Sequence, residues 1–222
     1  MDSHIVKIRS IEKVTHDVLS IVLNKPVHYK FIPGQATEVA INKPGWAAEK
    51  RPFTFTSLPD DDFLEFTIKT YPSHNGVTNE LLHLKPGDEL IIHDVWGAIS
   101  YKGKGVFIAG GAGVTPFLSI FRHLNTRNEI QGNKLIFANK TKADIIHESE
   151  LRNMLGNAFI NILSDEVADG YVKGMITENF LKENISDFDK TFYVCGPPPM
   201  MDAIQGYLTN LGVGSGSVVV EI

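Results

Sequence analysis

Two short segments of this chain place glycine and proline directly after apolar runs. The first is Gly110-Gly-Ala-Gly-Val-Thr-Pro116, which follows the run 106–109. A short apolar run of this kind is typical of a buried parallel strand, and the glycines would let the backbone approach a ligand closely. Thr115 suits the N-cap of a following helix, and Pro116 suits its first position. A strand, a glycine turn and a helix start in this order can bind phosphate at the free N–H groups of the helix.

This glycine turn departs from the dinucleotide fingerprint at one position. Gly111 and Gly113 match the pattern G-x-G-x-x-G, but Pro116 stands in place of the third glycine. Alone, the turn is as consistent with a tight strand–helix connection as with a nucleotide site. A second segment, Cys195-Gly-Pro-Pro-Pro-Met200, also follows an apolar run and precedes a helical pattern. Two motifs in this order favour the nucleotide site.

The two motifs together resemble the pyridine-nucleotide domain of the ferredoxin–NADP reductase family. The resemblance implies binding of NADH or NADPH, with Cys195 beside the reacting ring; a buried small apolar residue is the alternative for this cysteine. Glu221 matches the near-terminal glutamate of the family, and a surface glutamate is its alternative. Family members often carry a terminal aromatic residue over the flavin, whereas this chain stops at Ile222, so we expect that cover to be absent or supplied otherwise. The implied nucleotide contacts are Gly110, Gly111, Gly113, Val114, Thr115, Pro116, Cys195, Gly196, Pro197 and Met200.

The segment Arg51-Pro-Phe-Thr-Phe-Thr-Ser57 predicts a strand with a different chemistry. An arginine fixed on a strand suits bidentate contact with a pyrophosphate, and alternation places the two phenylalanines on one face and Thr54 and Thr56 on the other. An ordinary aromatic-rich strand with a solvated arginine is the alternative. The segment resembles the Arg-x-Tyr-Ser flavin motif of the same family, with Phe53 in place of tyrosine and Thr54 in place of serine.

That resemblance implies a role for each residue of the motif. Arg51 and Pro52 would lie at the flavin diphosphate, Phe53 would pack by the isoalloxazine, and Thr54 would hydrogen-bond near flavin N5. Three residues would then act at the reaction itself, namely Thr54, Cys195 and Glu221.

A third segment, Asn75-Gly-Val-Thr78, predicts a turn followed by a short helix. Thr78 can cap that helix, and a plain helix cap is the alternative to a phosphate site. The family carries a Gly-Gly-x-Ser/Thr motif here that holds the FAD diphosphate, and Asn75 replaces the first glycine tolerably because asparagine visits the left-handed region. The implied contacts are Asn75, Gly76, Val77 and Thr78, and together with Arg51 they favour FAD over FMN.

The choice of nicotinamide nucleotide is expected to depend on Ser164 and Asp165. NADP-selective members carry Ser-Arg at the end of the corresponding strand, where the arginine pairs with the 2′-phosphate. A carboxylate suits ribose hydroxyls and repels a 2′-phosphate, so Asp165 favours NADH. A polar loop without a ligand is the alternative, and Lys140 could still pair with the phosphate.

The order of apolar patterns predicts two domains of different class. Residues 1–101 read as an antiparallel FAD-binding β-barrel, and residues 102–222 read as a doubly wound parallel-sheet nucleotide-binding α/β domain. The polar, glycine-rich joint is 101–105. Strands are expected at 4–11, 18–23, 35–41, 51–57, 63–69, 88–93, 106–109, 135–138, 159–163, 192–194 and 217–220, and helices at 78–84, 116–125, 145–155, 178–183 and 199–210.

Composition excludes several classes of protein. A net charge of −5 gives no basic patch for nucleic acid, and no apolar run approaches the ~18 residues of a membrane helix. The N-terminus lacks the pattern of a signal peptide, which predicts a cytoplasmic protein. One cysteine excludes an internal disulfide and a Cys-ligated iron–sulfur cluster. No metal site is expected, because His74, His83, His93, His123 and His147 show no ligand spacing.

These expectations combine into an FAD-dependent NAD(P)H oxidoreductase that passes hydride to flavin and then electrons to a separate acceptor. With no cluster in the chain, a flavodoxin, a ferredoxin or an oxygenase component would be that acceptor. A reductase of free flavins is one alternative. An electron-transfer subunit that is active only inside a larger complex is the other.

Overall fold

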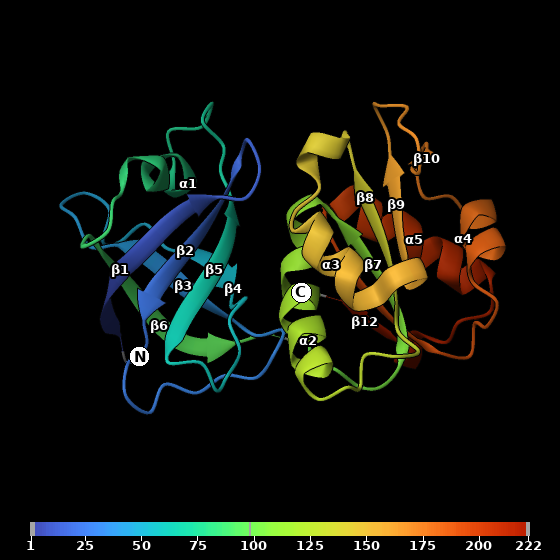
Figure 1. The fold of residues 1–222 in the computed structure, drawn as a ribbon, viewed down its shortest axis with the longest axis horizontal. Coiled ribbons are helices and arrows are strands. Elements are labelled where there is room, and N and C mark those ends of the chain that lie inside the picture. The colour runs from blue at the N-terminus through green and yellow to red at the C-terminus, as the bar shows by residue number, and fades with distance from the viewer. Residues whose placement is uncertain (1–2, 98, 221–222) are drawn as a thin grey trace.

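The computed structural model describes residues 3–97 and 99–220, which form two halves lying side by side (Figure 1). Each half contains one six-stranded sheet. The first sheet is antiparallel, with the order β4-β3-β6-β1-β2-β5, and the second is parallel, with the order β10-β9-β8-β7-β11-β12. This arrangement confirms the predicted fold class.

Most strands of the antiparallel half bury one face, as the alternating burial along 18–24 shows, whereas the strand 36–41 is buried on both faces. An isolated bridge between Phe55 and Phe66 joins the chain just after β4 to β5 and brings the two edges of the sheet together as a barrel. Phe55, Leu64 and Phe66 are fully buried inside it. Its elements are β1 (His4–Lys13), β2 (Val18–Asn24), β3 (Ala36–Ile41), β4 (Arg51–Thr54), β5 (Phe63–Lys69), α1 (Val77–Glu80), the 3₁₀ turn η1 (Leu81–His83) and β6 (Glu89–Trp96).

The parallel half begins at β7, whose residues are all buried because helices cover both faces of the sheet. Its strands are β7 (Gly105–Gly110), β8 (Lys134–Asn139), β9 (Phe159–Leu163), β10 (Val172–Lys173), β11 (Thr191–Cys195) and β12 (Val218–Val220). Its helices are α2 (Thr115–Thr126), α3 (Glu148–Leu155), α4 (Glu178–Asn184) and α5 (Pro198–Asn210). Its 3₁₀ turns are η2 (Gly111–Val114), η3 (Lys142–Asp144), η4 (Gly156–Ala158) and η5 (Ser215–Ser217).

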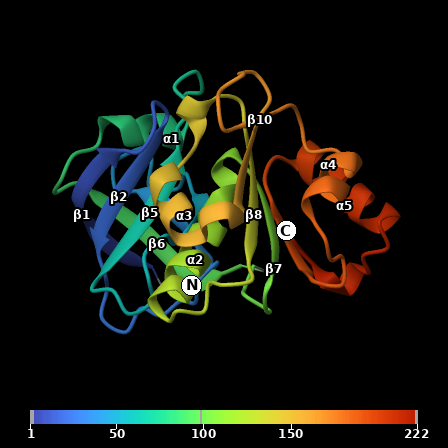
Figure 2. The same cartoon turned by 45° about the vertical axis from the view of Figure 1, so that its right-hand side comes forward.

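The two faces of the parallel sheet have different neighbours. Helices α2 and α3 lie between this sheet and the barrel, whereas α4 and α5 pack together on the far side (Figures 1 and 2). Val18 of β2 belongs to the same apolar cluster as the buried residues of α2, so the two halves share part of one core.

Several elements differ from the sequence-based prediction. The strand expected at 51–57 ends at Thr54, and the helix expected at 78–84 is α1 followed by η1. The helix expected from 145 begins at Glu148, because His147 has a left-handed backbone with φ of 50° and stands outside it. The short strand β10 is not predicted at all. It contains only Val172 and Lys173 and is flanked by glycines at 170 and 174, so it carries no pattern long enough to detect.

Candidate functional site

The two glycine- and proline-rich turns meet at the carboxyl edge of the parallel sheet. Strands β7 and β11 are neighbours, with Ala109 opposite Cys195. A Cβ placed on Gly113 would lie 2.5 Å from the carbonyl carbon of Cys195 and 2.7 Å from the Cα of Gly196. A Cβ on Gly110 would lie 3.0 Å from Pro197. Glycine is therefore needed at 113 so that the two turns can touch, and a Cβ at 110 would crowd the Pro197 ring.

Gly111 differs from these two glycines. Its φ of 53° is in the left-handed region, and a Cβ there would meet nothing within 4 Å. Glycine adopts this conformation without the penalty that other residues incur. The open side of the turn is therefore at Gly111, and the backbone there is free to approach a ligand.

The prediction that Thr115 caps the next helix is wrong. The glycine turn tightens into η2, so Val114 already has helical angles and serves as N-cap without a side-chain hydrogen bond. Thr115 is the first residue of α2, and its hydroxyl donates to the carbonyl of Ala112 at 3.0 Å. Pro116 follows as the second helical residue rather than the first.

The strand that begins at Arg51 has the predicted alternation. Phe53 and Phe55 pack on the barrel core, where the Phe53 ring lies 6.4 Å from that of Phe66. Thr56 lies on the outer face, where its hydroxyl hydrogen-bonds Glu65. Thr54 shares this face by alternation; it is 8% exposed, and its hydroxyl makes no hydrogen bond to any residue in the described ranges.

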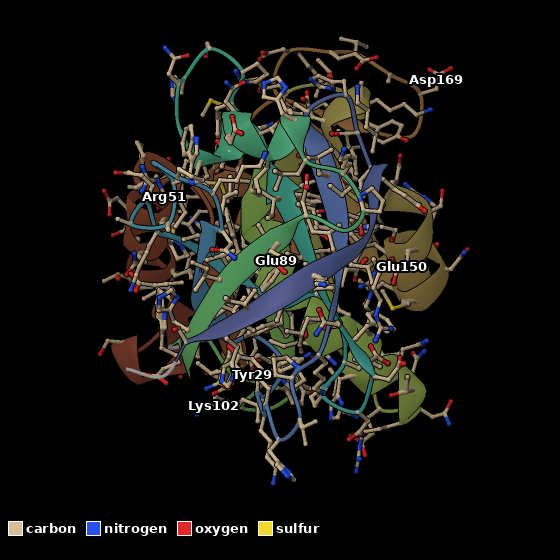
Figure 3. All side chains as sticks on the ribbon, turned by 90° about the vertical axis from the view of Figure 1, so that its left-hand side faces the viewer. Tyr29, Arg51, Glu89, Lys102, Glu150 and Asp169 are labelled. Atoms are coloured by element: carbon tan, nitrogen blue, oxygen red, sulfur yellow. The ribbon has the colours of Figure 1, made fainter. Side chains whose placement is uncertain are left out.

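Arg51 itself is close to half exposed at the start of β4. One guanidinium nitrogen donates to the carbonyl of Lys50 at 2.6 Å, and another lies 3.6 Å from the Glu49 carboxylate. The side chain keeps donors available, because an arginine has five. In Figure 3, which looks toward the barrel, Arg51 and Glu150 lie at opposite margins.

The segment 75–78 forms the start of α1, but Thr78 does not cap it. The helix begins one residue earlier, at Val77, with Gly76 as N-cap and no side-chain hydrogen bond. Val77 is buried, whereas a Cβ on Gly76 would meet nothing within 4 Å. The loop between β3 and β4 lies against this helix through an ion pair between Lys43 and Glu80 at 3.4 Å.

The loops after β8 and β9 are joined at the same carboxyl edge of the sheet. The Ser164 N–H donates to the Asn139 carbonyl at 3.0 Å, and the Asp165 N–H donates to the Lys140 carbonyl at 2.9 Å. The Ser164 hydroxyl donates to the Asp165 carboxylate at 2.7 Å. Lys173 of β10 donates to the Ser164 carbonyl, so a lysine that the sequence does not single out lies beside the two predicted residues.

A buried polar cluster connects the barrel to α2 and α3. Arg122 of α2 binds both carboxylate oxygens of Glu150, at 2.6 and 2.9 Å, and donates to the Thr56 carbonyl at 2.7 Å. It also pairs with Glu65. His147 completes the cluster with a contact of 3.4 Å to the Thr67 hydroxyl. A cleft of about 550 Å³ opens beside it.

Charge in this cluster shifts two pKa values. Burial alone would raise the pKa of the Glu65 carboxyl, but Arg122 and hydrogen bonds from Ser20 and Thr56 outweigh burial and hold that pKa below its usual range. Burial lowers the pKa of His147, and the Arg122 guanidinium lowers it further against the opposing effect of Glu150 and Glu65. Near neutral pH, the cluster therefore contains an ionised glutamate and a neutral histidine.

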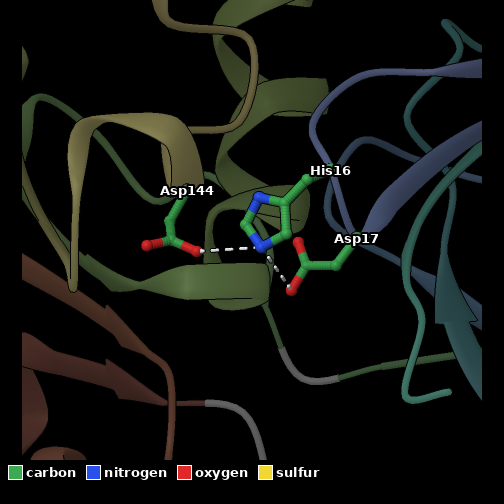
Figure 4. Close-up of side chains that lie close together, drawn as sticks. All are labelled: His16, Asp17 and Asp144. Atoms are coloured by element: carbon green, nitrogen blue, oxygen red, sulfur yellow. Dashed lines mark ion pairs between the residues drawn. The ribbon is translucent and has the colours of Figure 1, made fainter.

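A second polar contact between the halves involves His16, Asp17 and Asp144 (Figure 4). The Nε2 atom of His16 lies 3.7 Å from a carboxylate oxygen of each aspartate. These three groups are close enough to surround an ion, yet both carboxylates already have other partners. Asp17 pairs with Lys69 at 2.7 Å, and Asp144 accepts hydrogen bonds from Thr141 in a capping box. The contact connects the barrel to the loop after β8.

The structure brings together most of the residues predicted from the sequence. The two turns are in contact, the loop of Ser164 and Asp165 lies at the same edge of the sheet, and the strand of Thr54 packs against α2. Between Arg51 and the segment 75–78, no hydrogen bond or ion pair is found within residues 3–97 and 99–220. Glu221 lies outside the described residues.

Three residues near these motifs were missed by sequence reasoning. Ala36 is the paired residue of both Trp96 and Thr54 on the two neighbouring strands. The half-exposed indole of Trp96 therefore lies on the same face of the sheet as Thr54. Arg122 could have been noticed as a strong cation within an otherwise largely apolar helix. Lys173 carries no local signal.

Comparison with known proteins agrees with this geometry. Residues 3–88 match the model of an FAD-binding domain, and residues 107–206 match that of the oxidoreductase NAD-binding domain. The ferredoxin NADP⁺ reductase of Neisseria gonorrhoeae has the same fold, with a TM-score of 0.85, 17% identity and coverage of 99% of this chain and 98% of that one. The chain belongs to the ferredoxin–NADP reductase-like family.

One relative in sequence and one further solved structure are similar along most of the chain. The reductase component of propane 2-monooxygenase from Mycolicibacterium goodii is 32% identical over 91% of this chain, which spans 62% of that protein. The FAD/NAD-binding domain of nitric oxide dioxygenase from Vibrio cholerae O1 biovar El Tor superposes with a TM-score of 0.87 at 22% identity, covering 99% and 98% of the two chains. In the described part of the present chain, no helix is long and apolar enough to cross a membrane.

The polar groups of the present chain fit FAD and a nicotinamide nucleotide. Arg51 offers a guanidinium. The first N–H groups of α1 have no acceptor inside the helix, and the space beside Gly76 is open. Thr54 offers a hydroxyl without a partner in the described chain. At the carboxyl edge of the parallel sheet, both amide atoms of Asn139 are buried without a partner among the described residues. Groups of this kind are satisfied by a ligand or by water.

Proposed function

We propose that this chain is an FAD-dependent oxidoreductase that takes hydride from NADH or NADPH and passes electrons to a separate acceptor. The observation that carries the proposal is the path of α2. This helix starts at the glycine turn that contacts Cys195, and it packs against the strand of Thr54. The two cofactor motifs are therefore joined by one rigid element. An FAD-binding domain over 1–101 and a nucleotide-binding domain over 102–222 fit this arrangement.

Different residues of the barrel would bind different parts of the flavin cofactor. Arg51, with Pro52 beside it, would bind the diphosphate together with the segment 75–78, because a guanidinium and helix N–H groups both suit phosphate oxygens. Thr54 would hydrogen-bond the polar edge of the isoalloxazine, and Phe53 would pack beside the ring. When bound, FAD accepts a hydride and can release electrons one at a time.

The parallel half would orient the nicotinamide nucleotide. Gly111 lets the backbone approach the pyrophosphate, and Cys195 stands at the end of β11, where the two turns meet. Asp165 would contact the adenosine ribose, so we propose a preference for NADH. The further contacts that we propose, from the resemblance, are Gly110, Gly113, Val114, Thr115, Pro116, Ser164, Gly196, Pro197, Met200 and, at the reaction, Glu221.

We propose a small electron carrier or an oxygenase component as the acceptor. The related propane 2-monooxygenase protein is named as a reductase component, and this chain spans 62% of its length. A flavodoxin, a ferredoxin or an oxygenase component would each satisfy this role. We propose that the protein works in the cytoplasm, where NADH and NADPH are available as hydride donors.

The spectrum and turnover of the purified protein test the proposal. We expect a yellow protein with about one FAD per chain that oxidises NADH when ferricyanide is supplied as an artificial acceptor. A colourless protein that turns over added riboflavin would instead identify a reductase of free flavins. A yellow protein that does not oxidise NADH or NADPH alone would identify a subunit that is active only in a larger complex.

A further inference from the structure

Arg122 makes contacts to three separate elements. It binds Glu150 of α3 with two hydrogen bonds, donates to the Thr56 carbonyl after β4, and pairs with Glu65 of β5. Its side chain is 19% exposed, and that of Glu65 is 13% exposed. Arginine can make all these bonds at once because its five donors lie in one plane.

The contacts of Arg122 connect the two cofactor motifs through the backbone. Thr56 lies two residues after Thr54 on the same outer face of the barrel. Along α2, Arg122 lies about 10 Å from Thr115, which is the first residue after the glycine turn. One turn nearer to that end, the Ser119 hydroxyl donates to the Ser57 carbonyl at 3.4 Å. Helix α2 therefore binds two successive carbonyls just after β4, in the segment 51–57, which is called the flavin strand below.

This placement bears on hydride transfer because the two rings must meet between the halves. The barrel half provides the flavin strand, and the parallel half provides both nucleotide turns. A displacement of ~1 Å between reacting groups can lower a rate by about 100-fold without loss of binding. A side chain that fixes the strand of Thr54 against α2 would therefore control the rate rather than the affinity.

We propose that Arg122 is a positioning residue for hydride transfer, which holds the flavin strand at a fixed distance from the nucleotide turn. The inference rests on the proposed function. Arg122 is not itself among the residues assigned to either cofactor, and it acts through the Thr56 carbonyl and through Glu65. Lysine would keep the charge but could not keep the bidentate contact with Glu150 and both barrel contacts together.

The test compares Arg122→Met and Arg122→Lys with Arg127→Met in the full chain loaded with FAD. Arg127 lies just after the same helix and is exposed, and its ion pair within the described ranges is with the nearby Glu129. Anaerobic stopped-flow measurements give the limiting rate of flavin reduction, the dissociation constant of NADH and the absorbance of the nicotinamide–flavin charge-transfer complex. Hydrogen–deuterium exchange of the cofactor-free protein reports the peptides 55–67 and 115–126 independently of activity.

For Arg122→Met we expect a limiting rate about 10- to 100-fold lower and a weaker charge-transfer band, with the NADH dissociation constant within about 3-fold of wild type. Exchange should be faster in 55–67. Arg122→Lys should lie between this variant and wild type, and Arg127→Met should match wild type. If Arg122→Met does not fold, the double variant Arg122→Gln/Glu65→Gln removes the charge of Arg122 together with that of its more buried partner, and it should show the same pattern.

Two results would overturn the inference. One is a wild-type limiting rate and charge-transfer band in Arg122→Met. The other is an equal loss of rate, FAD content and NADH affinity in that variant, as a general loss of structure would give. Failure of the proposed function has a different signature. The wild-type protein would then hold no FAD or would be reduced by neither NADH nor NADPH, even if exchange in 55–67 still responded to Arg122.

Discussion

Gly113 lies directly against the carbonyl of Cys195, so the two cofactor turns are in backbone contact with no side chain between them. Gly113→Ala would force these backbones apart. We expect a loss of about 2–4 kcal/mol in the free energy of unfolding, because overpacking against backbone cannot relax by rotation of a side chain.

Gly206→Ala is the matched control. It lies in α5 with nothing within 4 Å of its Cβ, and it should stabilise the protein by about 0.5–1 kcal/mol. Urea unfolding of both variants measures the difference, and equal stabilities would contradict the close approach of the turns.

Arg51→Ala should weaken FAD binding. The loss of a charge-assisted contact to phosphate costs about 1.5–3 kcal/mol, which is roughly 10- to 150-fold in affinity. The FAD content after dialysis and the titrated dissociation constant report the effect. Arg9→Ala is the control, because Arg9 is also exposed and pairs with Asp62 elsewhere on the barrel. Full retention of flavin in Arg51→Ala would show that Arg51 is a surface residue without a ligand.

Asp165→Arg should shift the choice of nucleotide toward NADPH. The Asp165 carboxylate and the 2′-phosphate of NADPH, as unit charges ~4 Å apart at an effective dielectric constant near 20, repel by about 4 kcal/mol. Solvent and salt reduce this repulsion to about 1–3 kcal/mol, which is roughly a 5- to 150-fold preference for NADH. Lys140 and Lys173 oppose this preference if either reaches the phosphate. The measurement is kcat/KM for both nucleotides with ferricyanide. Asp169→Arg, near the tip of the same loop (Figure 3), is the control and should leave the ratio unchanged. A wild-type preference for NADPH that survives Asp165→Arg would place the ribose elsewhere.

Cys195→Ala should retain its fold and its FAD but reduce the flavin more slowly. The side chain is buried at the end of β11. Replacement by alanine leaves only a small void, and we expect the free energy of unfolding to fall by about 1 kcal/mol. Stopped-flow reduction by NADH measures the rate, with urea unfolding as a check on stability. A wild-type rate would assign Cys195 to packing alone.

His147 should make the protein sensitive to mild acid. Its pKa is lowered in the folded state, so below about pH 6.5 the unfolded chain takes up a proton that the folded chain does not hold. The free energy of unfolding should therefore fall as the pH decreases from 7 to 5, by at most about 1.4 kcal/mol per pH unit for this one proton. The variant His147→Asn should flatten that decrease, since asparagine tolerates the left-handed backbone at 147. The exposed His83→Asn is the control, and an unchanged slope in His147→Asn would contradict the assignment.

The parts of this structure that could be predicted from sequence depend on local patterns. The strand of Arg51 alternates, and the glycine and proline turns at 110–116 and 195–200 follow apolar runs, so their place in the fold follows from neighbouring residues. The helix cap at Thr115 was wrong for a local reason as well. Gly111 turns left-handed and the chain tightens into η2, which moves the N-cap to Val114.

The role of Arg122 could not be predicted in this way. Whether a cation on a helix faces solvent or a second domain depends on how the two halves dock, and no local spacing encodes that. The same holds for Glu65 and His147, which are 82 residues apart in the chain and meet only through the interface. The neighbourhood of Trp96 depends on strand pairing between segments that are far apart in sequence.

The short strand β10 limits the growth of the parallel sheet between molecules. A long outer strand would offer a row of unpaired N–H and C=O groups on which a second chain could add a strand. Here the outermost strand has two residues, and one of them is Lys173. A strand from another molecule would gain few hydrogen bonds there and would have to desolvate an ammonium group. Lengthening β10 or replacing Lys173 with an apolar residue would therefore increase the tendency of the protein to aggregate.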